Sequence, residues 1–250
     1  MKKLNGEKLK EYYSNVEKMS SLLSRNEELI RDAGYKPPVD NFSIEKEKRI
    51  KMPQGYIRTS GEFWRQYHLN DIVDNRNTKN NISYALQLSD YYNYLLNRFY
   101  IWGSIERMLY KQAFVNIVSI TESLILETAN NINKHCKKCP KIGKCGKNLT
   151  RDERSNMKKS ALKLWKIGIL DFKEEEINVI VEMYDYRNKI HIRLNEQNEF
   201  LDNKYNRELY NQAISYLKQV DDKLWKNGVQ YYESCMGFEK IERNSINSDL

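Results

Sequence analysis

Residues 187–191 read Arg-Asn-Lys-Ile-His and combine a fixed positive charge, an amide and an imidazole within five positions. Arg187 and His191 are four residues apart, so in a helix their side chains project from nearly the same face. Arginine can bind a phosphate through its planar guanidinium, and histidine can exchange a proton near neutral pH. This spacing suits chemistry on a phosphodiester. Because a charged helix also produces Arg and His four apart by chance, the surrounding elements must distinguish the two interpretations.

A second group of candidate residues lies in a Cys-rich loop at 135–148. Three of the four cysteines fall within ten residues and a histidine precedes them: His135, Cys136, Cys139 and Cys145. Cys-x2-Cys lets two thiolates reach one zinc ion, and the other two residues complete a four-ligand set. The sequence thus predicts a structural zinc ion at 135–145. Two alternatives stay open: a solvated basic loop with reduced thiols, or Cys235 as a remote ligand, because adjacent His135 and Cys136 do not easily reach one ion.

The elements that must position these residues are helices. Apolar residues recur at helical spacing in six segments: 5–33, 82–102, 104–134, 150–167, 171–191 and 203–232. The segment 104–134 is apolar around much of its circumference, which is typical of a central helix. Strand-like alternation is missing, and 4 prolines and 10 glycines are few for a β-sandwich. The sequence predicts an all-α, up-and-down helical bundle with additional N-terminal helices.

Local signals place several boundaries. Thr59 with Glu62, and Thr150 with Glu153, have the spacing of a capping box, so we expect a helix to begin at each pair. Asp171 is expected to cap the helix that leads into Arg187. The run 74–81 is polar and rich in Asn, which predicts a loop. These signals predict an N-terminal helical extension at 1–80, a helical bundle at 81–236 and a polar tail at 237–250.

Charge and hydropathy limit the function classes. The net charge is +8 and the pI about 9.1, so a polyanionic partner is favoured without being required. The mean hydropathy is −0.80, and the apolar runs are too short to span a membrane. The N-terminus passes directly into charged residues, which is unlike a signal peptide. We therefore expect a cytoplasmic protein with no membrane partner.

The long apolar helix with an internal acid, the helix ending in Arg-Asn-x-x-His and the closing amphipathic helix together resemble the HEPN superfamily over residues 104–232. The resemblance implies a HEPN-type bundle whose Arg-Asn…His element lies at a homodimer interface. It places Arg187, Asn188 and His191 in the motif, with Glu122 as the acidic partner on the first core helix. This chain has three residues between Arg187 and His191, where the family usually has four to six.

Many members of that superfamily are metal-independent ribonucleases of toxin–antitoxin or antiviral defence systems. The resemblance therefore implies an endoribonuclease that acts on RNA without a catalytic cofactor, leaves 2′,3′-cyclic phosphate ends and has a cognate inhibitor protein. His191 would transfer protons, Arg187 would stabilise charge on the phosphate, and Asn188 would orient either the histidine or the substrate. Glu122 would hold His191 or Arg187, although a buried acid paired with a basic residue of a neighbouring helix explains it equally well.

Two other functions fit the same sequence. One is a non-catalytic HEPN-like module that binds RNA or nucleotides or mediates dimerisation. The other is a regulatory protein that binds a partner through its N-terminal helices, and it predicts an exposed apolar face on residues 5–33. His68 has no partner motif and is expected to be a surface or boundary residue.

Overall fold

A computed structural model of the chain describes residues 5–36, 45–53, 55–137, 148–189 and 204–236. The chain divides into two compact units, Met1–Met52 and Pro53–Leu250. The first unit contains α1 (Gly6–Asp32) and a short 3-10 helix, Lys46–Lys48. The second contains α2 (Ser60–Gln66), α3 (Leu69–Ile72), α4 (Arg76–Arg98), α5 (Gly103–Cys136), α6 (Arg151–Ser155), α7 (Met157–Lys166), α8 (Glu174–Asn188) and α9 (Arg207–Met236).

All regular secondary structure in the described residues is helical, which confirms the predicted all-α class. α2 and α3, which the sequence analysis assigned to an N-terminal extension ending at residue 80, lie in the same compact unit as the bundle. No helix in the described ranges is long and apolar enough to cross a membrane.

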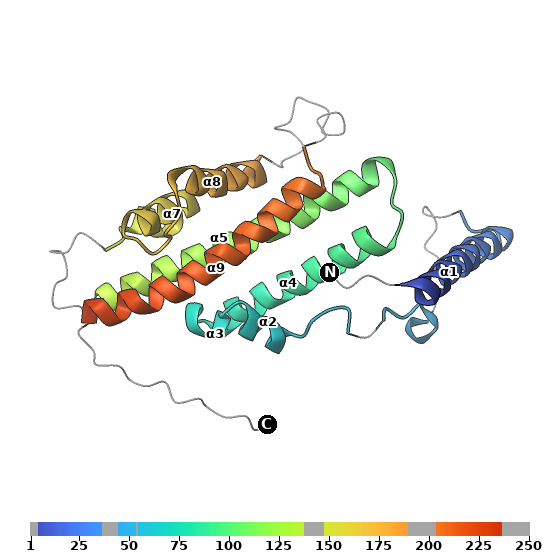
Figure 1. Cartoon of the computed structure of the whole chain (residues 1–250), viewed down its shortest axis with the longest axis horizontal. Helices are drawn as coiled ribbons and strands as arrows, with labels where there is room; N and C mark the ends of the chain where they lie inside the picture. The colour runs from blue at the N-terminus through green and yellow to red at the C-terminus, as the bar shows by residue number, and fades with distance from the viewer. Residues whose placement is uncertain (1–4, 37–44, 54, 138–147, 190–203, 237–250) are drawn as a thin grey trace, which may run out of the picture. The chain divides into compact units, whose positions relative to one another are not determined.

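The centre of the second unit is α5, which packs against α4 on one side, against α7 and α8 on another, and along the length of α9 (Figure 1). The colour gradient in Figure 1 shows that α4 and α8 run opposite to α5 and α9, as an up-and-down bundle requires. Fully buried side chains occur along most of α5, including Phe114, Leu124 and Ile132. Burial of each such side chain contributes roughly 1.5–3 kcal/mol, so α5 organises the core.

The helix α9 packs on α5 through one apolar stripe. Its buried residues follow an alternating three- and four-residue spacing: Tyr210, Ala213, Leu217, Val220 and Leu224. This is the period that places side chains on one face of a helix. Asp221, next to this stripe, is also buried.

Both predicted capping boxes are present. The Thr59 hydroxyl accepts from the backbone N–H of Glu62, and the Thr150 hydroxyl accepts from that of Glu153; each glutamate reaches back to the first residue's N–H. Each pair satisfies backbone donors that the first turn of a helix leaves without partners.

Two predicted boundaries are wrong. The polar run 74–81 is not a loop: the Asn75 side chain accepts from the N–H groups of Asn77 and Thr78, so it caps α4, which begins at Arg76. Asp171 does not cap α8. The N-cap is Lys173, whose backbone N–H donates to the Glu176 carboxylate at 2.9 Å. In each case a polar side chain forms a hydrogen bond with the backbone at the start of the helix. Composition alone did not indicate at which residue the helix would begin.

In the first unit, α1 has the predicted amphipathic sequence but buries none of its residues. Its apolar side chains are largely solvent-exposed, with Leu22 at 64% and Met19 at 55%. Exposed apolar area of this kind on a long helix is typical of a surface that binds another protein segment.

Candidate functional site

Arg187 lies in the last turn of α8, on the same face of the helix as its apolar stripe. Ile177 and Ile180 are buried and Tyr184 is half-buried, and the same spacing then reaches Arg187. Because α8 packs against α5, the side chain that continues this stripe is directed toward α5. The acidic first turn of α8 and the arginine in its last turn both match the helix dipole.

The Arg187 guanidinium contacts three residues. Its Nη2 lies 3.3 Å from Oε2 of Glu122, its Nε donates to Oγ of Ser119 at 3.4 Å, and its Nη1 donates to Oδ1 of Asn188 at 2.9 Å. Glu122 and Ser119 are one turn apart on α5, so they present their oxygens on one face. The structure thus brings together Arg187, Asn188 and Glu122 of the four residues that the sequence analysis proposed for catalysis.

Partial burial makes this cluster more than a surface ion pair. The side chains of Arg187 and Glu122 are 33% and 18% exposed. A charge pair that is partly shielded from water is screened less than one on an open surface, and the guanidinium is therefore held in a defined orientation. Arginine has five N–H donors in a planar fork, so a guanidinium fixed in this way can still present an edge to an anion.

Ser119 contributes an acceptor to this cluster. Its hydroxyl donates to the carbonyl of Val115 at 2.8 Å, one turn earlier in α5. Its hydrogen is thereby directed at the helix backbone, and a lone pair faces Arg187. Ser119 was not among the site residues predicted from the sequence, although its position three residues before Glu122 on the central helix places it on the same face.

His191 lies outside the described residues, so its proposed role in proton transfer stays a prediction. Within the described part of the chain, the site consists of an oriented guanidinium and the side chains that hold it. This geometry is suited to binding and neutralising a phosphate oxygen.

The predicted zinc ligands are described in part. His135 is exposed and Cys136 is 8% exposed, in the last turn of α5. Adjacent helical residues point about 100° apart, which explains the difference in their exposure. Cys139 and Cys145 lie outside the described residues, and the zinc site stays a prediction.

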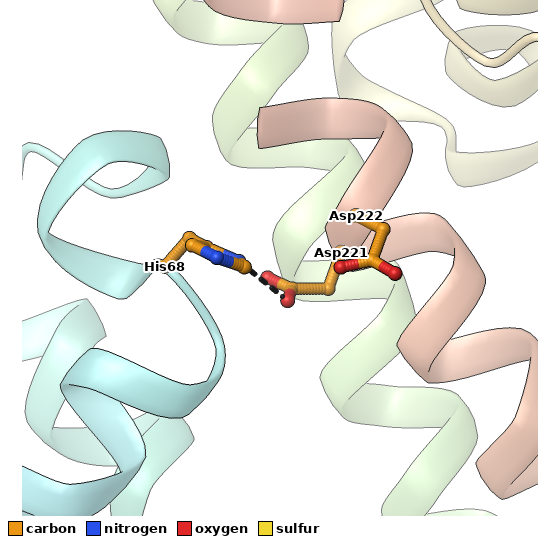
Figure 2. Close-up of side chains that lie close together, drawn as sticks. All are labelled: His68, Asp221 and Asp222. Carbon is orange, nitrogen blue, oxygen red and sulfur yellow. Dashed lines mark hydrogen bonds and ion pairs between the residues drawn. The ribbon is translucent and has the colours of Figure 1, made fainter. Parts of the chain in front are cut away.

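A further cluster involves His68, which the sequence analysis expected at the surface or boundary. Its Nδ1 lies 2.9 Å from Oδ2 of Asp221, and its ring stacks on Trp225 at a centroid distance of 4.1 Å and an interplanar angle of 9°. Figure 2 shows the imidazole directed at the carboxylate, with Asp222 beside it. His68 and Asp221 are 153 residues apart, so no local sequence pattern indicated the pair.

Asp221 is 2% exposed. Burial of the Asp221 carboxylate raises its pKa to about 6, although the hydrogen bond from His68 acts in the opposite direction.

No protein-family model, no curated protein and no solved structure matches this chain.

Proposed function

We propose that the protein is a metal-independent endoribonuclease of the HEPN type. The observation that supports this proposal is the half-buried Arg187 guanidinium at the end of α8, held by Glu122, Ser119 and Asn188. Fixing a cation before substrate arrives removes the cost of orienting it in the transition state. The net charge of +8 favours association with a polyanion such as RNA.

In the proposed reaction, the imidazole of His191 removes the proton of a ribose 2′-OH. The 2′-oxygen forms a bond to phosphorus while the bond from phosphorus to the 5′-oxygen breaks, and a protonated imidazole returns a proton to that leaving oxygen. Arg187 stabilises the charge on the non-bridging oxygens. The products are a 2′,3′-cyclic phosphate and a 5′-hydroxyl.

A homodimer would supply the second imidazole. The family resemblance places the Arg-Asn…His element at a dimer interface, so one protomer's His191 acts as base and its partner's as acid. Light scattering of the purified protein tests this arrangement, and a strictly monomeric, active enzyme would contradict it.

The decisive experiment compares RNA cleavage in EDTA by wild type, Arg187→Ala and His191→Ala, with Arg76→Ala as the control. Arg76 is an exposed arginine at the start of α4, so this control removes the same charge away from the site. We expect both site variants to lose cleavage by about 100-fold or more and the control to retain it. Cleavage that requires added Mg²⁺, or that persists in His191→Ala, would contradict the mechanism.

The proposal extends to a role as a toxin or antiviral effector with a cognate inhibitor protein. Expression of wild type should arrest growth, and expression of Arg187→Ala should not. Binding of RNA without cleavage by the wild type would instead support the non-catalytic module.

A structural zinc ion at 135–145 is a separate part of the proposal. Elemental analysis of protein purified without added zinc should show about one zinc ion per chain that is lost after Cys139→Ser. A zinc content near zero would exclude the site.

A second candidate function is partner binding by the N-terminal unit, and the exposed apolar side chains of α1 favour it. Replacing Leu22 and Leu29, which are 64% and 50% exposed, with glutamine should abolish binding of such a partner while leaving RNA cleavage unchanged. Unchanged partner binding would exclude α1 as the interface.

A further inference from the structure

His68, Asp221 and Asp222 bring three metal-binding side chains together from two distant segments. His68 is the N-cap of α3, and the two aspartates are neighbours on α9. One donor atom from each residue lies within 4.8 Å of the other two. Figure 2 shows the His68 ring directed at the Asp221 carboxylate, with the Asp222 carboxylate next to that of Asp221. Among the described residues, this group has donors positioned to share one ion.

The position of His68 is fixed by its surroundings. Its backbone is left-handed, with φ of 42°, which is uncommon for a residue with a side chain. Leu69 and Ile72 of α3 are buried in the core, and the Asn131 side chain on α5 donates to the carbonyl of Ile72 at 2.9 Å. Together with the stacking on Trp225, these contacts orient the imidazole toward α9.

Asp221 supplies the independent evidence for a ligand. Its Oδ2 interacts with His68, but its Oδ1 is buried and has no hydrogen-bond partner. A buried carboxylate oxygen without a partner is destabilising because it has lost its hydration, so native proteins usually pair it. A cation bound beside this carboxylate would remove that cost.

We propose that His68, Asp221 and Asp222 bind a divalent first-row transition-metal ion of the zinc class. One imidazole nitrogen with two carboxylates matches the ligands that such ions accept, whereas an imidazole disfavours Mg²⁺ and Ca²⁺. The two carboxylates balance the charge of the ion. A tetrahedral ion with bonds of about 2.1 Å requires its donor atoms to lie roughly 3.4 Å apart. Asp222 is exposed, so its side chain can rotate to reach this spacing.

The bound ion would join the α3 segment to α9. It takes no part in the proposed nuclease reaction, because none of its ligands belongs to the Arg187 site. Metal binding at this site is therefore independent of RNA cleavage.

The test is calorimetric titration of the metal-stripped full-length chain with Zn²⁺. All proteins carry Cys139→Ser and Cys145→Ser, so that the Cys-rich loop does not contribute. Asp222→Asn removes the negative charge of one ligand at an exposed position, and Glu208→Gln is the matched control for loss of an exposed acid on α9. Equal thermal midpoints in EDTA will show that both variants fold as the parent does.

We expect the parent to bind one Zn²⁺ per chain, Asp222→Asn to bind at least about tenfold more weakly, and Glu208→Gln to bind as the parent does. Zn²⁺ should also raise the thermal midpoint of the parent, because a ligand that binds the native state stabilises it. Absence of binding by the parent, or equal affinity in Asp222→Asn, would overturn the proposal.

Discussion

Arg187 and Glu122 are 65 positions apart in sequence (187 − 122), and the ion pair between them defines the candidate site at the scale of single residues. The carboxylate and the guanidinium are both half-buried, so each restrains the other. If RNA cleavage depends on this restraint, Glu122 acts as a positioning residue through Arg187.

The first prediction concerns this coupling. Glu122→Gln keeps the shape of the side chain but removes its charge, and we expect cleavage to fall about tenfold with a stability change of about 1 kcal/mol or less. Because Glu122 acts through Arg187, Glu122→Gln should have little further effect in an Arg187→Ala background. Cleavage rates of the two single variants and the double variant measure the coupling, and additive losses would contradict it.

Asp221 leads to a prediction about pH. Burial raises its pKa to about 6 in the folded chain from an ordinary value of 3.8, so between these values the native state binds more protons than the unfolded state. The stability that Asp221 contributes is therefore fully present below pH ~3.8 and is lost as the pH rises through ~6, by roughly 3 kcal/mol at most.

Urea denaturation in EDTA at several pH values from 4 to 7 measures this loss. Asp221→Asn cannot ionise, so its stability should fall less than that of the wild type over the same range. If the free energy of unfolding falls equally with pH in the two proteins, the prediction is contradicted.

Among the elements, α5 was the most predictable. Its apolar circumference identified it as central, and the capping boxes at Thr59 and Thr150 located two helix starts. These features follow from local sequence. The start of α4 was not predictable from composition, because the same Asn side chains favour loops and helix caps, and only the bonds from Asn75 decide between them.

The contact between α4 and the segment before α2 gives a prediction at this scale. Arg58 donates through Nε to Oδ2 of Asp90 at 2.9 Å and through its backbone N–H to the same oxygen at 3.0 Å, and the Asp90 side chain is 10% exposed. Asp90→Ala leaves these donors without an acceptor, and we expect it to lower the free energy of unfolding by about 1.5–3 kcal/mol.

The control for this measurement is Asp74→Ala. Asp74 pairs with Lys134, and both side chains are 59% exposed, so the loss should stay below about 1 kcal/mol. Equal losses in the two variants, measured by urea denaturation, would show that the Arg58–Asp90 pair does not stabilise this contact.

At the scale of the whole molecule, the chain has two compact units, and the first contributes no buried residue through α1. Because no residue of α1 is buried, the core of the second unit should remain folded when α1 is deleted. We expect deletion of residues 1–52 to change the thermal midpoint of the second unit by no more than about 2 °C, measured by circular dichroism. A much lower midpoint or a non-cooperative transition would show that the first unit stabilises the bundle.

The pairing of His68 with Asp221 marks the limit of what the sequence could predict. His68 precedes a four-residue helix and Asp221 lies beside an apolar stripe. Neither local pattern predicts that the two side chains are in contact. Their contact arises because α3 packs against α9, a long-range arrangement that local periodicity does not encode.

The stacked rings of His68 and Trp225 also give the protein an intrinsic optical reporter. Indole fluorescence responds to an aromatic ring in van der Waals contact and to the charge of that ring. The emission of Trp225 therefore reports on docking of the α3 segment without an added label. The chain has 4 tryptophans, and replacing Trp64, Trp102 and Trp165 with phenylalanine would isolate that signal. Time-resolved emission could then follow local opening at this end of the bundle separately from global unfolding.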